Sequence, residues 1–188
     1  MTTLDELRAA LDPEWLRETG QADPTRLFAR AGRRLGHAPL PGVPGWTAAQ
    51  AGRAVLLGRL NPEEITTIYH QGDANERLAV LKALPLLDIG DAAVPLLHDA
   101  LRTNDARLVA AALGPYAEHL DADTWRQGVV KCVFMGVPLD AVDRLDDRAD
   151  AELAVILGGL AEEREAAGRT IPGDATALLD RRSRRKGN

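Results

Sequence analysis

The sequence predicts an all-α fold, either a short α-solenoid of HEAT-like helix pairs or an irregular helical bundle. Ala and Leu dominate its apolar residues, whereas the alternating runs of Val, Ile and Thr that are typical of strands do not occur. Residues that begin helices recur before apolar stretches, and glycines recur after them. Segments 75–84 and 105–113 resemble each other and flank an amphipathic segment at 93–101, which is the pattern of stacked helix pairs.

Start and stop signals place each helix along the chain. Asn61 and Pro62 form an N-cap followed by a proline at the first helical position. Asp73 and Glu76 have the spacing of a capping box, and Gly72 before them ends the preceding helix. Similar start signals are Asp91, Asn104, Asp121 and Asp146. The predicted helices cover residues 4–11, 13–19, 24–31, 47–59, 62–71, 74–84, 92–102, 105–112, 122–135, 139–145, 147–167 and 174–181.

One segment, residues 32–45, is predicted to be an extended loop. It is rich in proline and glycine, and proline removes a backbone donor and fixes φ. The roughly 30 residues before it are too few to bury a core of their own. The chain is therefore divided into an N-terminal helical segment (1–31), a Pro/Gly-rich loop (32–45), a helical-repeat body (46–180) and a disordered basic tail (181–188).

Composition limits the function classes. The 188 residues carry a net charge of −5, which argues against a nucleic-acid partner because such a protein needs a positive field. A single cysteine excludes an internal disulfide and a cysteine zinc site. The N-terminus lacks the basic and apolar regions of a secretory signal, and no stretch approaches the ~18 apolar residues of a membrane helix. We therefore expect a cytoplasmic protein without direct membrane insertion.

The densest polar cluster lies between Tyr69 and Arg77. His70 there has the chemistry of a general base or ligand, with Asp73 or Glu76 to orient it. A structural interpretation explains the same residues, because Asp73 and Glu76 cap a helix and a histidine suits the last turn of the helix before it. The structural interpretation is favoured, and both remain open at the level of sequence.

A second unusual feature is Lys131, which lies in a helix that is apolar on nearly every side. Its amine must reach water, meet a carboxylate or bind an anionic ligand, because a buried unpaired charge is costly. The neighbouring Cys132 is expected to be a buried, unreactive thiol with a raised pKa. The four histidines lack the spacing that places two metal ligands on one helix face, and no serine elbow or phosphate loop occurs. No metal, cofactor or catalytic residue is therefore expected.

Four blocks of residues together resemble one family. They are Tyr69–Asp73 continuing into Glu76 and Arg77, Leu101–Asp105, Lys131–Pro138 and Arg148–Ala154. In this order they resemble an EboA-domain protein over roughly residues 25–170. Members often carry Tyr-Ala-His-Glu-Arg-Trp late in the long helix, whereas the matching stretch here is Leu160–Glu165 and lacks the histidine. A site that uses that histidine is therefore not expected in this chain.

The resemblance implies an all-helical bacterial protein without established enzymatic activity. Such proteins are encoded beside a TatD-like hydrolase, a UbiA-like membrane prenyltransferase, a dehydroquinate-synthase-like enzyme and a sugar-phosphate isomerase-like protein, in clusters that make or export specialised metabolites. The leading hypothesis is a non-catalytic cytoplasmic scaffold that binds proteins of the same cluster, such as the prenyltransferase. The alternative is a protein or enzyme that binds an anionic, cyclitol- or sugar-phosphate-like molecule around His70 and Lys131. The candidate ligand- or partner-binding residues are Tyr69, His70, Asp73, Glu76, Arg77, Arg102, Asn104, Lys131, Arg148 and Glu152.

Overall fold

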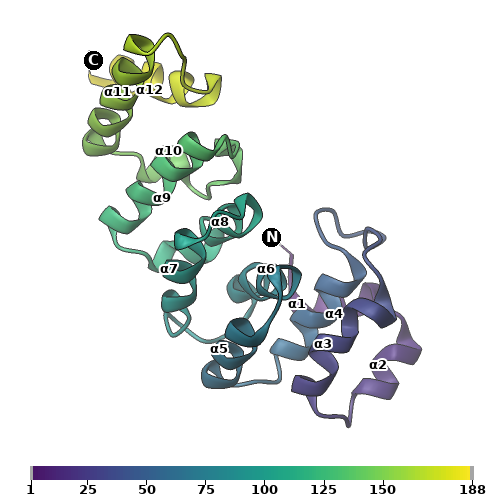
Figure 1. Cartoon of the computed structure of the whole chain (residues 1–188). Coiled ribbons are helices and arrows are strands. Elements are labelled where there is room, and N and C mark those ends of the chain that lie inside the picture. The colour runs from purple at the N-terminus through teal and green to yellow at the C-terminus, as the bar shows by residue number, and fades with distance from the viewer. Residues whose placement is uncertain (1, 187–188) are drawn as a thin grey trace. The chain divides into compact units, whose positions relative to one another are not determined.

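The chain is all-α, as its sequence predicts. The computed structural model describes residues 2–186, with side chains through Arg181, and this part forms twelve α-helices and three short 3₁₀-helices without a strand (Figure 1). It divides into two compact units, Met1–Leu96 and Leu97–Asn188, which are described separately below. Whether the helices stack as a solenoid or form an irregular bundle stays a prediction.

The first unit is built around α4. Its elements are α1 (Leu4–Ala10), α2 (Pro13–Thr19), α3 (Pro24–Leu35), α4 (Ala48–Leu57), α5 (Pro62–Gln71), α6 (Ala74–Ala83) and η1 (Leu84–Leu86). Helix α4 packs against α1, α3 and α6, and most of its residues are buried. Gly52 allows this close packing, because a Cβ atom there would lie 3.1 Å from the Trp15 ring and would collide with Leu35.

The second unit is built around α9. Its elements, together with α7, which crosses the division, are α7 (Val94–Arg102), α8 (Ala106–Ala112), η2 (Pro115–His119), α9 (Ala122–Met135), η3 (Leu139–Ala141), α10 (Leu145–Arg148), α11 (Ala151–Ala166) and α12 (Gly173–Lys186). Helix α9 packs against α8, α11 and η3, and α11 packs against α12. The buried side of α9 presents Trp125, Val129, Cys132 and Val133 to this core.

Most predicted helices are confirmed, and the differences are shifted ends, an additional 3₁₀-helix and one divided helix. Helix α3 continues to Leu35, into the segment predicted to be a loop, and η2 was not predicted. In place of one helix over 139–145 the chain forms η3 and then α10. Helix α12 continues through Lys186, whereas disorder was expected from residue 181, and residues 187–188 lie outside the described part.

Two predicted caps are wrong, because an aspartate further along the chain takes the position. Asp105 rather than Asn104 caps α8, where its side chain accepts from the Arg107 N–H at 2.9 Å. Asp150 rather than Asp146 caps the long helix, where it accepts from the Leu153 N–H at 2.9 Å. Both aspartates sit directly before the first helical residue, which is the geometry that an N-cap needs.

Cations stack on aromatic rings in both units. In the first unit Arg53 lies 5.2 Å from the Phe28 ring centroid, Arg77 lies 5.3 Å from Tyr69 and Lys82 lies 4.6 Å from Trp46. In the second unit Arg148 lies 4.8 Å from Trp125 and Arg164 lies 5.5 Å from Phe134. These distances are within the range of a cation–π attraction.

Candidate functional site

The polar cluster of the first unit joins two helices. Asp73 and Glu76 form the predicted capping box of α6, and Gly72 is the C-cap residue of α5. Arg77 donates to the carbonyls of Gly72 at 3.0 Å and His70 at 3.1 Å, so it satisfies backbone groups at the end of α5. These contacts favour the structural interpretation of the cluster.

The two aromatic members of this cluster differ in exposure. Tyr69 is fully buried, and the exposed His70 ring meets it edge-on at a centroid distance of 5.4 Å. The His70 backbone carbonyl accepts from Arg77, and its imidazole lies at the surface of the unit. The contacts of His70 are therefore those of a helix C-terminus rather than those of a catalytic base held in a cleft.

A buried ion pair in the first unit has no counterpart in the sequence analysis. Arg53, whose side chain is 5% exposed, donates to the Glu76 carboxylate at 3.1 Å and to the Phe28 carbonyl at 3.1 Å. Glu76 is 14% exposed and also accepts from the Asp73 N–H in the capping box. The available signal was the arginine itself, which stands in the otherwise apolar second half of α4.

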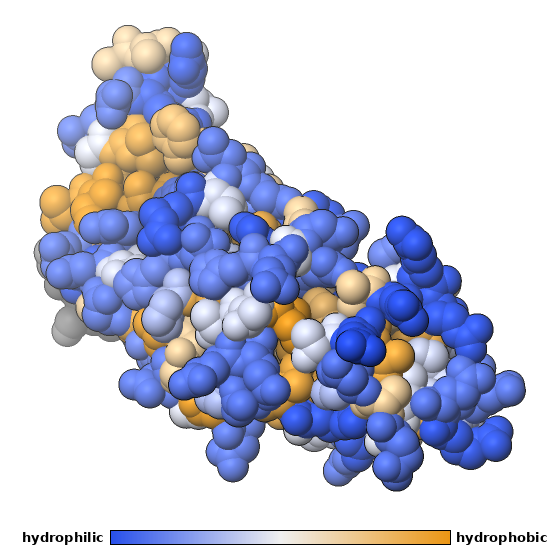
Figure 2. Space-filling model, turned by 60° about the horizontal axis from the view of Figure 1, so that its bottom comes forward, coloured by the Kyte–Doolittle hydropathy of each residue, from blue (hydrophilic) through white to orange (hydrophobic). Residues whose placement is uncertain are grey.

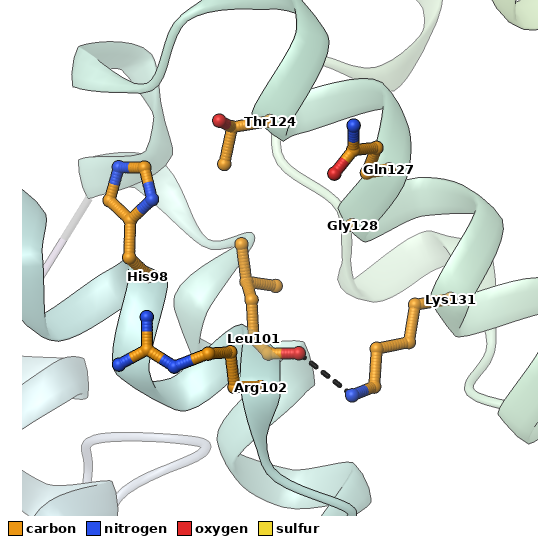
Figure 3. Close-up of a pocket in the computed structure, with 7 residues that line it drawn as sticks. All are labelled: His98, Leu101, Arg102, Thr124, Gln127, Gly128 and Lys131. Atoms are coloured by element: carbon orange, nitrogen blue, oxygen red, sulfur yellow. Dashed lines mark hydrogen bonds between the residues drawn. The ribbon is translucent and has the colours of Figure 1, made fainter.

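The second unit contains a pocket of about 360 Å³ between α7 and α9. It is lined by His98, Leu101, Arg102, Thr124, Gln127, Gly128 and Lys131 (Figure 3). Two of the predicted candidates, Arg102 and Lys131, therefore line the same pocket. Its lining also includes His98, Thr124 and Gln127, which the sequence analysis did not include among the candidates.

Lys131 does not meet the partner that the sequence suggested. Its ammonium donates to the backbone carbonyl of Leu101 at 2.7 Å, and no carboxylate pairs with it in the described part of the chain. The helix around it is also less central than predicted, because Phe134 is 69% exposed. Helix α9 is thus buried on one side and open to solvent on the other.

The remaining candidates of the second unit have separate roles. Arg148 donates to the carbonyls of Ala117 at 2.5 Å and Leu120 at 2.9 Å, and burial lowers its pKa. Exposed Asn104 precedes the cap of α8, and exposed Glu152 pairs with Arg126 at 3.1 Å. These side chains do not line the α7–α9 pocket.

Arg126 connects three acids near the start of α11. It binds Asp150 at 2.7 Å and also pairs with Asp123 and Glu152. Its hydrogen bond holds the pKa of Asp150 at about 2, well below the ordinary value for aspartate. On the buried side of α9, burial raises the pKa of Cys132 to about 11, in the direction that the sequence predicts.

Large apolar side chains are exposed to solvent on both α9 and α11. Phe134 is 69% exposed, Val155 is 72% exposed and Ile156 is 39% exposed. Figure 2 shows apolar side chains gathered on the part of the molecule formed by the C-terminal helices. Arg164 from α11 stacks on the Phe134 ring, which places the two helices side by side at this point. We call Phe134, Val155 and Ile156 together the α9–α11 apolar surface; Val155 and Ile156 lie on one face of α11, and Phe134 lies beside Arg164 on another side of that helix.

Comparison with known proteins identifies the family. In the described residues no helix is long and apolar enough to cross a membrane, and no cluster of His, Cys, Asp or Glu is able to hold a metal ion. No curated protein and no solved structure matches the chain. The family described as metabolite traffic protein EboA matches residues 36–179, which is most of the chain. The protein therefore belongs to the EboA family.

Proposed function

We propose that this protein is a non-catalytic accessory protein of the cytoplasm, which holds a partner protein of a specialised-metabolite cluster. The observation that carries the proposal is the α9–α11 apolar surface. Val155 and Ile156 lie next to each other on one exposed face of α11, and contiguous exposed apolar side chains mark interaction sites. The family description, metabolite traffic, supports a role in moving a compound between proteins rather than in converting it.

The surroundings of this surface indicate the chemistry of the partner. Along α11, Glu152, Val155, Ile156, Gly159, Glu162 and Glu163 follow one another at helical spacing and are all exposed. The apolar residues thus lie in the middle of the face, with acids at both ends. Glu162 and Glu163 make no ion pair within the described residues, so their charges are available. The complementary partner has an apolar centre flanked by Lys or Arg.

A membrane protein supplies such a surface on its cytoplasmic side. Its cytoplasmic loops carry an excess of Lys and Arg, which suits the acidic ends of the α11 face. The UbiA-like membrane prenyltransferase that the family resemblance places in the same cluster belongs to this class. We therefore propose it as the partner, with the contact made by α9 and α11.

Co-purification tests this proposal. Tagged full-length protein, expressed with the other proteins of its cluster, is purified in mild detergent, and the prenyltransferase is quantified in the eluate. Phe134→Ser combined with Val155→Ser is expected to reduce its recovery by about tenfold or more, as for central residues of an interface. Both side chains are exposed, so far-UV circular dichroism is expected to remain unchanged.

Matched variants separate apolar contact from charge. Phe134→Leu combined with Val155→Ile keeps the surface apolar and is expected to retain the partner. Glu162→Gln combined with Glu163→Gln is expected to weaken recovery at low salt, whereas Glu118→Gln on η2 is expected to have no effect. Equal recovery with the serine variant and the native protein would refute the proposed contact.

A further inference from the structure

We infer that the α7–α9 pocket binds a small phosphate monoester that also carries hydroxyl groups. The pocket lies within the second unit and has about 360 Å³ of space, at the lower end of the range for small-molecule sites. This inference uses none of the residues of the α9–α11 apolar surface and is independent of the proposed docking function.

Close packing of two helices forms the pocket floor. A Cβ atom at Gly128 would lie 2.9 Å from Leu113 and 3.2 Å from Leu101, so glycine at this position lets α9 approach α7. The approach brings the Lys131 ammonium to the Leu101 carbonyl at 2.7 Å. That bond uses one of its three N–H donors and fixes the ammonium beside the pocket, with donors left for a ligand.

The charge of the lining favours an anion. Lys131 and Arg102 are basic side chains on the two helices that form the walls, and none of the seven lining residues is an acid (Figure 3). Of the acids nearby, Asp99 pairs with Arg102 itself at 3.1 Å and Asp121 caps α9, so Lys131 is the lining cation without an acidic partner in the described residues. Arg102 is 72% exposed, so its remaining donors can turn toward a bound anion.

Phosphate fits this arrangement better than carboxylate. A phosphate monoester carries about −1.5 to −2 charges and three acceptor oxygens, so it can accept from Lys131 and also from Arg102 once the exposed Arg102 guanidinium, which points away from Lys131 in Figure 3, turns toward it. The other polar groups of the lining are hydrogen-bonding groups that suit hydroxyls: the amide of Gln127, the hydroxyl of Thr124 and the imidazole of His98 (Figure 3). The Thr124 hydroxyl donates to Asp121 at 2.7 Å, which leaves its oxygen as an acceptor.

An NMR titration of the ¹⁵N-labelled full-length protein tests the inference, with glucose 6-phosphate as the probe. Saturable shifts are expected at the Gly128 amide and the Gln127 side-chain amide. Glucose is expected not to bind, and gluconate and inorganic phosphate are expected to bind more weakly than the probe. The absence of a saturable shift at millimolar concentrations of the probe would overturn the inference. If gluconate or inorganic phosphate bound as tightly as glucose 6-phosphate, the proposed ligand class would be wrong.

Substitutions locate the binding. Lys131→Met replaces the charged side chain by an unbranched apolar one. It is expected to lower the affinity for the probe by about tenfold or more, which is the usual effect of losing a charged hydrogen bond. Arg102→Gln changes an exposed side chain that the fold does not need, and it is expected to weaken the probe several-fold. Arg169→Gln removes the same charge from an exposed site outside the pocket and is expected to have less than about a twofold effect, as for a distant screened charge. Equal weakening by Arg102→Gln and Arg169→Gln would overturn the site.

Discussion

Glu76→Gln is expected to destabilise the first unit through the charge that it leaves behind. Glu76 and Arg53 lie 3.1 Å apart, and the arginine side chain is 5% exposed. At that distance two unit charges attract by about 5 kcal/mol at an effective dielectric constant near 20. Desolvation of both groups offsets much of this attraction, so the intact pair contributes little net stability. Removing one charge is different, because the Arg53 guanidinium then stays buried without the carboxylate that compensates it.

The expected cost follows from that asymmetry. Breaking a buried ion pair on one side costs about 3–5 kcal/mol, and the 14% exposure of Glu76 places this pair at the lower end, near 3 kcal/mol. Urea unfolding followed by far-UV circular dichroism measures the difference. Adding Arg53→Met to Glu76→Gln is expected to recover part of the loss, because the buried charge is then gone.

Glu64→Gln is the matched control. Glu64 holds the same position in the capping box of α5 that Glu76 holds in α6, but it is exposed and has no buried cation beside it. Glutamine keeps the capping hydrogen bond in both helices. The control is therefore expected to change the free energy of unfolding by less than about 0.5 kcal/mol. If Glu76→Gln and Glu64→Gln differ by less than about 1 kcal/mol, the buried-charge explanation is wrong.

Three further predictions concern the second unit. Arg126 holds the pKa of Asp150 at about 2, so the stability from this pair is complete above the ordinary aspartate pKa and is lost as pH falls toward 2. Asp150→Asn is therefore expected to make the free energy of unfolding depend less on pH between about pH 4 and 2. Cys132 is expected to react with a thiol reagent at pH 8 only after unfolding, since burial raises its pKa to about 11; fast native labelling would contradict this. Gly128→Ala is expected to destabilise the protein by about 1–3 kcal/mol, because the added methyl group overpacks the contact with Leu113 and Leu101. Gly159→Ala adds a methyl group in open space and is expected to stabilise the protein by about 0.5–1 kcal/mol. Thermal unfolding measures both changes.

Helix caps were predictable because their chemistry is local. Asp73 and Glu76 lie three residues apart, and the hydrogen bonds that they make join backbone groups of the same turn. The same locality explains the error at Asn104. Asn104 and Asp105 are both good N-caps, and the choice between them depends on where the helix begins within one residue, which pattern alone does not fix.

The site residues were harder to predict, because their contacts join distant segments. Arg53 and Glu76 are 23 residues apart, and Lys131 and the Leu101 carbonyl are 30 residues apart. Lys131 was singled out correctly as unusual, but its backbone partner depends on how closely α9 approaches α7. The exposure of Val155 could not be predicted from the sequence either, because an apolar residue in an apolar helix gives the same pattern whether it faces a core or solvent.

The stacked cations restrict which substitutions the protein tolerates. Phe28, Tyr69, Trp46, Trp125 and Phe134 each carry a cation on the ring, in a chain with only seven aromatic residues. Exchange of Phe28 or Phe134 for leucine would keep an apolar side chain of similar size, yet the neighbouring arginine would lose the aromatic ring that it contacts. Ring and cation are thus expected to vary as couples during evolution, so that losing one member relaxes the constraint on the other.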